Sequence, residues 1–423
     1  MKRKFCIVGA SGRSTTMYVE SIVKEFNDTC ELAGIYDINP GRARYVAHTY
    51  GADCPVFEDF DEMIATAKPD ALIVVCMDVY HAPYVIKGLE YGLYVFTEKP
   101  MCINAEQVEA ILEAEKKYGR RIGVCFNMRY YDTVLYIKNL LDTGVIGEIY
   151  SANMDWLLAR PKVNSGHGAS YYHRWNAEME KSGGLLITKA THHFDVANWL
   201  IGQHPEKVSA FGQLRVYGPK NAPFKGERCH GCPHADECEF SWADHNDTDA
   251  VGMFYNNEKL DGYIVDSCVY RDAVNIYDSM AISVQYDGGC VLTYTESSAA
   301  AYEGWHFTLN GEKGRMEIAC YAKGAGGLKP DEDFDFIRVI DMNNNVTTYP
   351  LPPAREGSHG GSDYDLRKVL FGGEEPSRPD QRASSIEGAY SVLLGAAANQ
   401  SIAEGRIVTI REMLKDPTLL DRE

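Results

Sequence analysis

Short apolar runs alternate with amphipathic segments over the first 125 residues of the chain. The run at 71–75 is almost continuously apolar, which is typical of a parallel strand covered on both faces. The pattern predicts strands at 5–8, 31–36, 55–57, 71–76, 93–97 and 121–125, and helices at about 15–26, 40–50, 58–66, 82–91 and 104–118. We therefore predict an α/β domain at 1–126 with a doubly wound parallel sheet.

The hydrophobic pattern changes after about residue 130. A helix at about 131–142 leads into a strand, and a second helix lies near 189–201. Strand-like alternation recurs at 207–217, 261–270, 278–286, 289–297 and 304–319, and a last helical pattern covers about 384–404. We predict a second α/β domain at 127–423 with a mostly antiparallel sheet and a Cys-rich insertion at about 218–250.

Charge and composition exclude several classes of protein. The 423 residues include 42 Lys+Arg and 60 Asp+Glu, which gives a formal net charge of −18. This balance argues against a nucleic-acid or anionic-membrane partner, because both favour a basic surface. No apolar stretch approaches the roughly 20 residues of a membrane span. Strand and turn follow the basic start directly, so we expect no signal peptide.

Cysteine usage favours a reducing compartment. The chain has 12 cysteines, and several stand singly inside apolar runs: Cys6, Cys76, Cys125 and Cys320. Isolated cysteines in such runs are typical of reduced, buried thiols. We therefore expect a cytoplasmic protein.

The tripeptide Glu98-Lys99-Pro100 follows the apolar run at 93–97. Counting the alternations places Lys99 at the carboxyl end of the fifth predicted strand, the edge at which doubly wound sheets bind ligands. Pro100 stops the strand from continuing. We expect Lys99 to face whatever lies on the cofactor; the alternative is a surface Glu–Lys pair.

A glycine turn follows the first predicted strand and has features of a phosphate cradle. The usual fingerprint is G-x-G-x-x-G. Here Gly9 holds the first position, and Ser11 and Ser14 hold the second and third. Serine hydroxyls could donate to a pyrophosphate at the start of the helix. The alternative is an ordinary strand–helix turn with a serine cap.

Asp37 ends the second predicted strand and strengthens the cofactor prediction. A carboxylate there can accept hydrogen bonds from the ribose hydroxyls of NAD and would repel a 2′-phosphate. We therefore predict NAD over NADP, with a helix cap as the alternative role of Asp37. The predicted cofactor-binding residues are Gly9, Ser11, Gly12, Arg13, Ser14, Asp37, His81, Glu98 and Lys99.

Several motifs occur together along the chain. They are Cys6-Ile7-Val8-Gly9, His81-Ala82-Pro83, Gly92 to Pro100, Val124 to Tyr130, Gly144 to Ile149, Gly183-Gly184-Leu185-Leu186, His192 with Asp195, Trp199 to Gly202, Glu387 to Leu393 and Gly405 to Val408. Together they resemble the Gfo/Idh/MocA oxidoreductases over nearly the whole chain. The resemblance implies a Rossmann domain followed by an α/β domain with a large open sheet. It also implies a tightly held NAD or NADP, hydride transfer at a secondary alcohol carbon of a sugar, cyclitol or glycoside, and assembly into dimers or tetramers.

Oxidation of a carbinol requires removal of the hydroxyl proton. Lys99 could hold that oxygen and stabilise developing negative charge. With the resemblance, His192 is predicted to act as the general base, because its pKa can lie near neutrality. Asp195, three residues further, is expected to orient that imidazole or to anchor the helix. A buried or surface histidine without a catalytic role is the alternative for His192.

The family often has an aspartate four residues before this histidine, whereas this chain has Thr188 followed by Lys189. A second lysine beside Lys99 would depress one lysine pKa by like-charge repulsion. It would also favour an anionic or carbonyl-bearing substrate, so we count Lys189 among the predicted catalytic residues. The alternative is that Lys189 points to solvent.

Aromatic and polar residues at 171–175 suit a sugar, because aromatic faces stack on C–H surfaces and polar groups bind hydroxyls. A subunit contact is the alternative. The segment 359–363 is expected either to close over the pocket or to cap a helix through Asp363. The predicted substrate-binding residues are Asn127, Arg129, Tyr172, Arg174, Trp175 and His193, although His193 also fits a buried role.

A dense group of cysteines and histidines lies in the insertion. A Cys-x-x-Cys pair with a third cysteine suits metal ligation in a reducing compartment. We predict a structural zinc bound by Cys229, Cys232, Cys238 and one histidine, with His234 preferred over His230 and His245. An iron–sulfur cluster, a disulfide and free thiols are the alternatives.

Three functions remain open from the sequence. The leading prediction is an NAD-dependent dehydrogenase of a sugar, polyol or glycoside, assembled as a homodimer or homotetramer. The second is an NAD-dependent glycosidase that oxidises the sugar transiently, eliminates the aglycone and returns the hydride. The third is a non-catalytic sensor of NAD or sugar.

Overall fold

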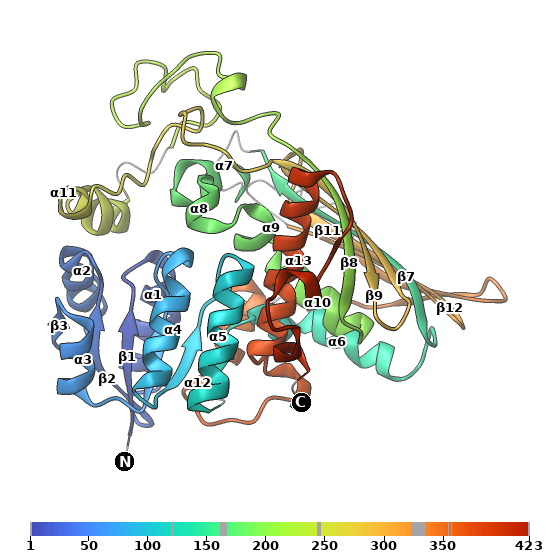
Figure 1. Ribbon diagram of the computed structural model, residues 1–423, viewed down its shortest axis with the longest axis horizontal. Coiled ribbons are helices and arrows are strands. Elements are labelled where there is room, and N and C mark those ends of the chain that lie inside the picture. The colour runs from blue at the N-terminus through green and yellow to red at the C-terminus, as the bar shows by residue number, and fades with distance from the viewer. Residues whose placement is uncertain are drawn as a thin grey trace.

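Two β-sheets, one after the other in the sequence, organise the molecule (Figure 1). The computed structural model describes residues 2–119, 122–160, 167–242, 247–322, 335–353, 355–356 and 358–421. The first sheet uses residues up to Val124, and the second begins at Ile149.

The first sheet is parallel throughout its described strands, in the order β3-β2-β1-β4-β5-β6. Alternate residues of β1 enter different hydrophobic clusters: Phe5 and Ile7 join one, and Cys6 and Val8 join the other. Both faces are therefore covered, which confirms the predicted doubly wound sheet. The strands are β1 (Arg3–Val8), β2 (Cys30–Tyr36), β3 (Val56–Phe57), β4 (Ala71–Val74), β5 (Tyr94–Thr97) and β6 (Ile122–Val124).

Side-chain caps fix where the covering helices begin. Asn39 accepts a hydrogen bond from the Arg42 N–H at the start of α2, and Asn104 caps α5 in the same way. The helices are α1 (Gly12–Ser14), α2 (Pro40–Tyr50), α3 (Phe60–Ala67), α4 (His81–Glu90) and α5 (Ala105–Tyr118), with π-helical stretches η1 (Thr15–Val19) and η2 (Ser21–Glu25) and a 3-10 turn η3 (Asp78–Tyr80).

The second sheet has the order β14-β13-β12-β11-β7-β10-β9-β8-β15 among the described residues. Only β7 and β10 pair in parallel there, so the mostly antiparallel sheet is confirmed. In β9 buried and exposed residues alternate strictly, which leaves one face open. The strands are β7 (Ile149–Ala159), β8 (Pro205–Gln213), β9 (Ser279–Tyr286), β10 (Val291–Ala300), β11 (Gly304–Gly311), β12 (Gly314–Tyr321), β13 (Phe336–Asp341), β14 (Val346–Tyr349) and β15 (Val408–Thr409).

Helices cover the other face of this sheet. The longest, α13 (Ser385–Glu404), begins at a capping box of Ser384 and Glu387 and packs on β8, α10 and α5. The remaining helices are α6 (Asp132–Asp142), α7 (His167–His173), α8 (Met179–Ser182), α9 (Leu185–Thr188), α10 (Thr191–Ile201), α11 (Glu258–Asp261) and α12 (Ser362–Leu370). Shorter turns are η4 (Asn127–Tyr130), η5 (Trp175–Ala177), η6 (Pro219–Asn221), η7 (Ala250–Tyr255), η8 (Ser358–Gly361), η9 (Pro379–Gln381), η10 (Arg411–Met413) and η11 (Pro417–Leu420).

Two strand predictions are wrong. The segment 261–270 pairs with the Cys-rich insertion only through an isolated bridge between Arg228 and Ser267, so no ladder forms there. The predicted strand 304–319 is a hairpin, because the chain turns at 312–313 between β11 and β12. None of the described helices is both long and apolar enough to cross a membrane.

A segment near the C-terminus completes the core of the first sheet. Leu366 and Leu370 of α12 and the following Phe371 belong to the same hydrophobic cluster as Phe5 and Tyr18. The ring of Phe371 meets that of Phe5 edge-on, with centroids 5.2 Å apart. The predicted first domain is thus packed against residues far outside its predicted boundary, and that boundary stays a prediction.

Truncation of this late segment should weaken the first sheet. We expect Phe371→Ala to lower the free energy of unfolding by about 3–5 kcal/mol, measured by urea unfolding, because it leaves a cavity beside Phe5. Tyr364→Ala on the same helix is the control, because Tyr364 is 47% exposed; it should cost less than about 1 kcal/mol. Small effects of similar size for both variants would contradict this packing role.

Candidate active site

A cavity of about 1230 Å³ lies along the carboxyl edge of the first sheet. The segments after β1, β2, β4 and β5 form one side of it, and residues of α9, α10 and the second sheet form the other. Parallel sheets bind ligands at this edge, because loops and helix starts converge there. The cavity therefore lies where the sequence predicted the cofactor.

The glycine turn leaves room for a cofactor's phosphates. Gly9 has φ +110°, and a Cβ on it would lie 2.5 Å from the Cys76 backbone nitrogen, so the turn and the end of β4 are in direct contact. At Gly12 a Cβ would meet no atom within 4 Å, so the backbone there is open to the cavity. Such a turn fits a pyrophosphate.

The serines of this turn act within the fold. Ser11 and Ser14 form a reciprocal capping box. The Ser14 hydroxyl donates to the Ser11 carbonyl at 2.8 Å, and the Ser11 hydroxyl donates to the Val75 carbonyl at 3.3 Å. Both hydroxyl protons therefore already have acceptors within the fold, which favours the alternative of a serine-capped turn over donation to a phosphate.

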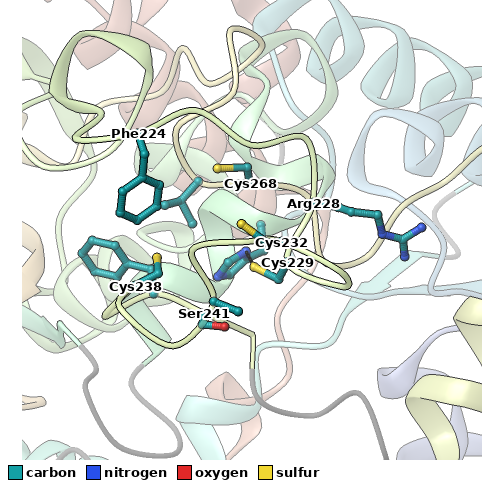
Figure 2. A pocket seen from close by; sticks show the side chains of 11 residues that line it. Phe224, Arg228, Cys229, Cys232, Cys238, Ser241 and Cys268 are labelled. Atoms are coloured by element: carbon teal, nitrogen blue, oxygen red, sulfur yellow. Dashed lines mark hydrogen bonds between the residues drawn. The ribbon is translucent and has the colours of Figure 1, made fainter.

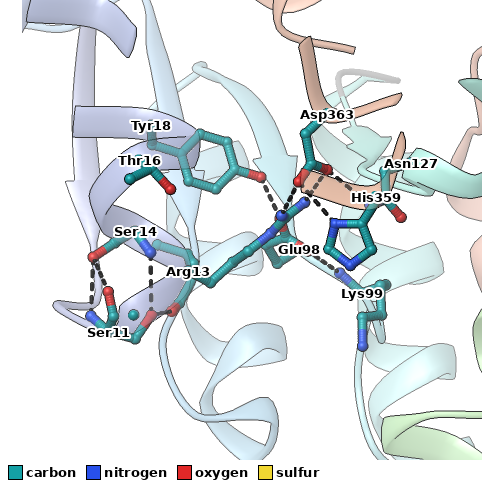
Figure 3. Close-up of polar contacts among 12 residues, drawn as sticks. Ser11, Arg13, Ser14, Thr16, Tyr18, Glu98, Lys99, Asn127, His359 and Asp363 are labelled. Carbon is teal, nitrogen blue, oxygen red and sulfur yellow. Dashed lines mark hydrogen bonds and ion pairs between the residues drawn. The ribbon is translucent and has the colours of Figure 1, made fainter. Parts of the chain in front are cut away.

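Arg13 joins three segments in a buried polar network (Figure 3). Its guanidinium donates to Glu98 at 2.7 Å and to both oxygens of Asp363 at 2.7 and 3.0 Å. Asn127 donates to the same Asp363 at 2.7 Å. Although burial opposes it, hydrogen bonds from His359 and Arg13 hold the pKa of Asp363 well below its usual range. The three predicted residues Arg13, Glu98 and Asn127 do line the cavity.

Asp37 and His81 occupy the predicted side of the cavity. Asp37 accepts hydrogen bonds from the backbone N–H groups of Ala10 and Asn39, both at 2.7 Å. His81 lies with Nδ1 2.7 Å from the Pro100 carbonyl and Nε2 3.1 Å from the Cys76 carbonyl. His81 therefore fixes the ends of β4 and β5 relative to each other. Asp37 and His81 both line the cavity, as predicted for cofactor-binding residues.

Lys99 donates to the Thr188 carbonyl at 3.1 Å and so reaches from the first sheet to α9. Burial, and then the positive charge of Lys189, lower the pKa of Lys99 to about 8. Asp78 stands beside it, and burial raises the pKa of that carboxyl to about 7. Sequence reasoning missed Asp78, although it follows β4 just as Lys99 follows β5, and the same edge rule would have found it.

His192 faces the cavity with its side chain almost entirely buried. Its Nδ1 has no hydrogen-bond partner within the described part of the chain. Burial, followed by the charges of Lys99 and Lys189, lowers its pKa well below the usual value. The imidazole is therefore neutral at neutral pH, and its pKa lies further below neutrality than the sequence suggested.

Asp195 does not contact His192. Both of its oxygens accept hydrogen bonds from the Arg129 guanidinium, at 2.7 and 2.8 Å, and both side chains are buried. This corrects two predictions, because Asp195 anchors α10 to η4 and Arg129 is consumed by that pair instead of facing a substrate.

Two further predicted contact residues are buried behind the wall. Tyr172 donates to the Tyr277 carbonyl at 2.9 Å, and the His193 ring stacks on Trp156 at 3.5 Å. Neither lines the cavity, which corrects their predicted contact with substrate. The neighbouring residues Tyr171, Arg174, Trp175 and Lys189 do line it.

The cysteines of the insertion gather around a small cavity of their own (Figure 2). Cys229, Cys232 and Cys238 are joined there by Cys268, which the sequence analysis did not include. The predicted ligand His234 instead stacks on the ring of Phe224, and His245 lies outside the described residues. Every cysteine is free, and no group of three or more His, Cys, Asp or Glu in the described chain is arranged to hold a metal ion. The predicted zinc site is therefore not supported.

Comparison with known families gives two matches that together cover most of the chain. Residues 3–126 match the Gfo/Idh/MocA model described as an oxidoreductase family with an NAD-binding Rossmann fold. Residues 138–410 match the C-terminal α/β domain of the same family. The chain belongs to the Gfo/Idh/MocA oxidoreductases. It is thus an enzyme of an NAD-binding oxidoreductase family.

Individual relatives agree with this membership. The oxidoreductase YteT of Bacillus subtilis is 32% identical over 435 residues, covering 97% of this chain and 98% of YteT. An inositol 2-dehydrogenase/D-chiro-inositol 3-dehydrogenase of Lactiplantibacillus plantarum is 25% identical over 45% of this chain and 49% of its own length.

The structure of the WlbA dehydrogenase of Bordetella pertussis, in complex with NADH and UDP-GlcNAcA, has a TM-score of 0.64 at 20% identity. The alignment covers 97% of this chain and 99% of WlbA, which shows a shared fold.

The Arg129–Asp195 pair should stabilise the Gfo/Idh/MocA fold of this chain. We expect Asp195→Ala to lower the free energy of unfolding by about 3–5 kcal/mol, because it leaves a buried guanidinium unpaired. The double variant Arg129→Met/Asp195→Leu should recover most of that loss. Urea unfolding of the three proteins checks this. Unchanged stability together with a lower kcat would show that Asp195 acts on the chemistry instead.

Proposed function

We propose that the enzyme transfers hydride between NAD and a secondary alcohol carbon of a sugar, polyol or glycoside. The observation that carries this proposal is the common cavity of Lys99 and His192 at the edge of the cofactor sheet. Lys99 comes from the end of β5 and His192 from α10. A substrate between them would therefore lie at the carboxyl edge of the first sheet, the edge that also carries the glycine turn.

The two residues would divide the proton chemistry. The ammonium of Lys99 would donate to the substrate oxygen and stabilise its developing negative charge. The neutral imidazole of His192 would take the hydroxyl proton during oxidation and return it during reduction. NAD, when bound, supplies the acceptor or donor of the hydride. Gly9, Gly12 and Asp37 would hold it, since they line the cavity at the cradle.

The opposite wall suits a carbohydrate. Trp156, Trp175 and Trp305 give aromatic faces, and Arg174 and Glu303 give polar groups at the same cavity. Named relatives fit this class, since they include inositol 2-dehydrogenases and a structure of an aldose-aldose oxidoreductase of Caulobacter crescentus with glycerol.

The positive charge of Lys189 restricts the class of substrate further. Its ammonium lies 5.8 Å from the centre of the Trp156 ring and lines the cavity together with Lys99. Two cations that face one cavity from opposite sides favour a substrate that carries a carboxylate or a second carbonyl.

We also propose that copies of the chain meet through the open face of the second sheet, where Phe211 is 78% exposed.

A substrate panel tests the proposed reaction. Purified protein is incubated with NAD and free sugars, sugar acids, polyols and aryl glycosides, and NADH absorbance and aglycone release are followed together. NADH formation with a free sugar, sugar acid or polyol is expected. Aglycone release without net NADH would identify a redox glycosidase instead, and neither signal with any substrate would contradict both reactions.

The charge of Lys189 should set the alkaline limit of activity. Lys99 has a pKa lowered to about 8, so the ammonium is lost and kcat should fall as the pH rises through about 8. Lys189→Met removes the like charge, raises the pKa of Lys99 and should move that fall upward by roughly one pH unit.

Lys181→Met is the matched control, because Lys181 lines the same cavity but is paired with Glu178 at 2.6 Å. Its pH profile should stay at the wild-type position. A rise of kcat through pH 8, or no displacement in Lys189→Met, would refute the role of Lys99 as a cation.

A further inference from the structure

A segment of the C-terminal half lies on the cofactor side of the first sheet. We call residues 248–264, which include η7 and α11, the strap. Figure 1 shows α11 directly above α2, the helix that follows the Asp37 strand. Phe254, Asp261 and Tyr263 of the strap line the large cavity together with Asp37.

The strap is held on α2 by close and specific contacts. Tyr45 and Tyr50 of α2 donate to the two oxygens of Asp249 at 2.7 and 2.6 Å. Glycines allow the backbones to approach, since a Cβ on Gly41 would lie 2.0 Å from the Asn257 side chain, and one on Gly252 would lie 2.0 Å from the Tyr45 ring. These hydrogen bonds and close contacts therefore fix the position of the strap relative to α2.

Arg42 is the point at which this contact reaches the cofactor site. Its side chain is 9% exposed, and one nitrogen, Nη2, donates both to Asp37 at 3.2 Å and to Asp261 at 2.5 Å. The other terminal nitrogen, Nη1, is buried and has no hydrogen-bond partner among the described residues. The Asp261 side chain is 14% exposed. The guanidinium also lies 5.8 Å from the centre of the Tyr263 ring. Two carboxylates from distant parts of the chain thus share one cation.

Arg42 and its two carboxylate partners set the net charge at the place where the adenosine ribose would lie. An arginine near the end of the second strand is the group that accommodates the 2′-phosphate of NADP in doubly wound sheets. Here one positive and two negative side chains leave a net charge of −1 at that place. A 2′-phosphate would add about −1.5 to −2, so it would meet repulsion and an arginine whose Nη2 is already shared by two carboxylates.

We propose that Asp261 is a cofactor-selectivity residue: together with Asp37 it occupies Arg42 and excludes the 2′-phosphate of NADP. The proposal rests on the proposed use of NAD but not on the identity of the substrate. Asp37 alone would leave Arg42 with one partner and no net charge, whereas the strap adds the second carboxylate. Selectivity for NAD is therefore shared between two regions of the chain.

Cofactor binding by the full-length protein tests this without any substrate. Dissociation constants for NAD⁺ and NADP⁺ are measured by titration calorimetry on cofactor-free wild type and Asp261→Asn. The variant removes one negative charge close to the 2′ position, so the affinity for NADP⁺ relative to NAD⁺ should rise at least about tenfold. The rise should shrink in high salt, where charges are screened.

Glu258→Gln is the matched control, because it removes the same charge from the same helix turn. Glu258 pairs with Arg228 at 3.0 Å and does not line the cavity. Its affinity ratio should equal that of wild type. Asp261→Ala repeats the test without an amide that could hold Arg42, and thermal unfolding shows that each variant is folded.

The outcomes separate this proposal from the proposed function. An unchanged ratio in both folded Asp261 variants, or an equal rise in Glu258→Gln, would overturn the role of Asp261 while leaving NAD binding intact. Wild-type binding of NADP⁺ as tight as that of NAD⁺ would overturn the proposed use of NAD over NADP. A selective rise in the Asp261 variants alone supports the proposal.

Discussion

One partly buried guanidinium holds together the parts of the chain that build the cavity. Arg13 leaves the glycine turn, bonds Glu98 at the end of β5 and reaches Asp363 at the start of α12. Its partners Glu98 and Asp363 are almost fully buried. Buried carboxylates without a cation would be costly, so the three segments are constrained to meet. The glycine turn, the end of β5 that carries Lys99 and the start of α12 are consequently fixed relative to one another. The cavity wall that they form is therefore preorganised.

Around this point the cavity collects positive charge. Lys99, Lys189 and His192 approach one another from β5, α9 and α10. Besides burial, the charge of Lys189 lowers the pKa of Lys99, and the charges of both lysines lower the pKa of His192. Asp78 and Glu98 are carboxyls on the cofactor side whose charges oppose the lowering of the Lys99 pKa. In other enzyme sites, too, different environments push the pKa values of neighbouring titratable groups apart, so that one group acts as the acid and another as the base.

Sequence patterns were sufficient for the strands of the first sheet and for residues at the ends of those strands. Gly9, Asp37 and Lys99 follow β1, β2 and β5, and the carboxyl edge of a parallel sheet brings such residues together whatever the loops do. The same rule would have included Asp78.

Pairings between distant residues could not be read from the sequence. Asp195 meets Arg129 across 66 residues, and Arg42 meets Asp261 across 219. Local spacing instead suggested that Asp195 contacts His192, one helical turn away, because periodicity describes neighbours on a helix but not what packs against it. The segment 261–270 was misjudged for the same reason, since its local pattern does not reveal that it meets the insertion through a single bridge and not a ladder.

The late return of Phe371 to the first sheet has a consequence for biosynthesis. The Cys30 thiol donates to the Phe371 carbonyl across 341 residues, so the hydrophobic cluster of the first sheet closes only when nearly the whole chain exists. At about 5–20 residues per second, a ribosome needs roughly 20–70 s to make that stretch. During this time the nascent N-terminal segment exposes the apolar surface that Leu366, Leu370 and Phe371 later cover, and such transiently exposed surface is of the kind that chaperones protect.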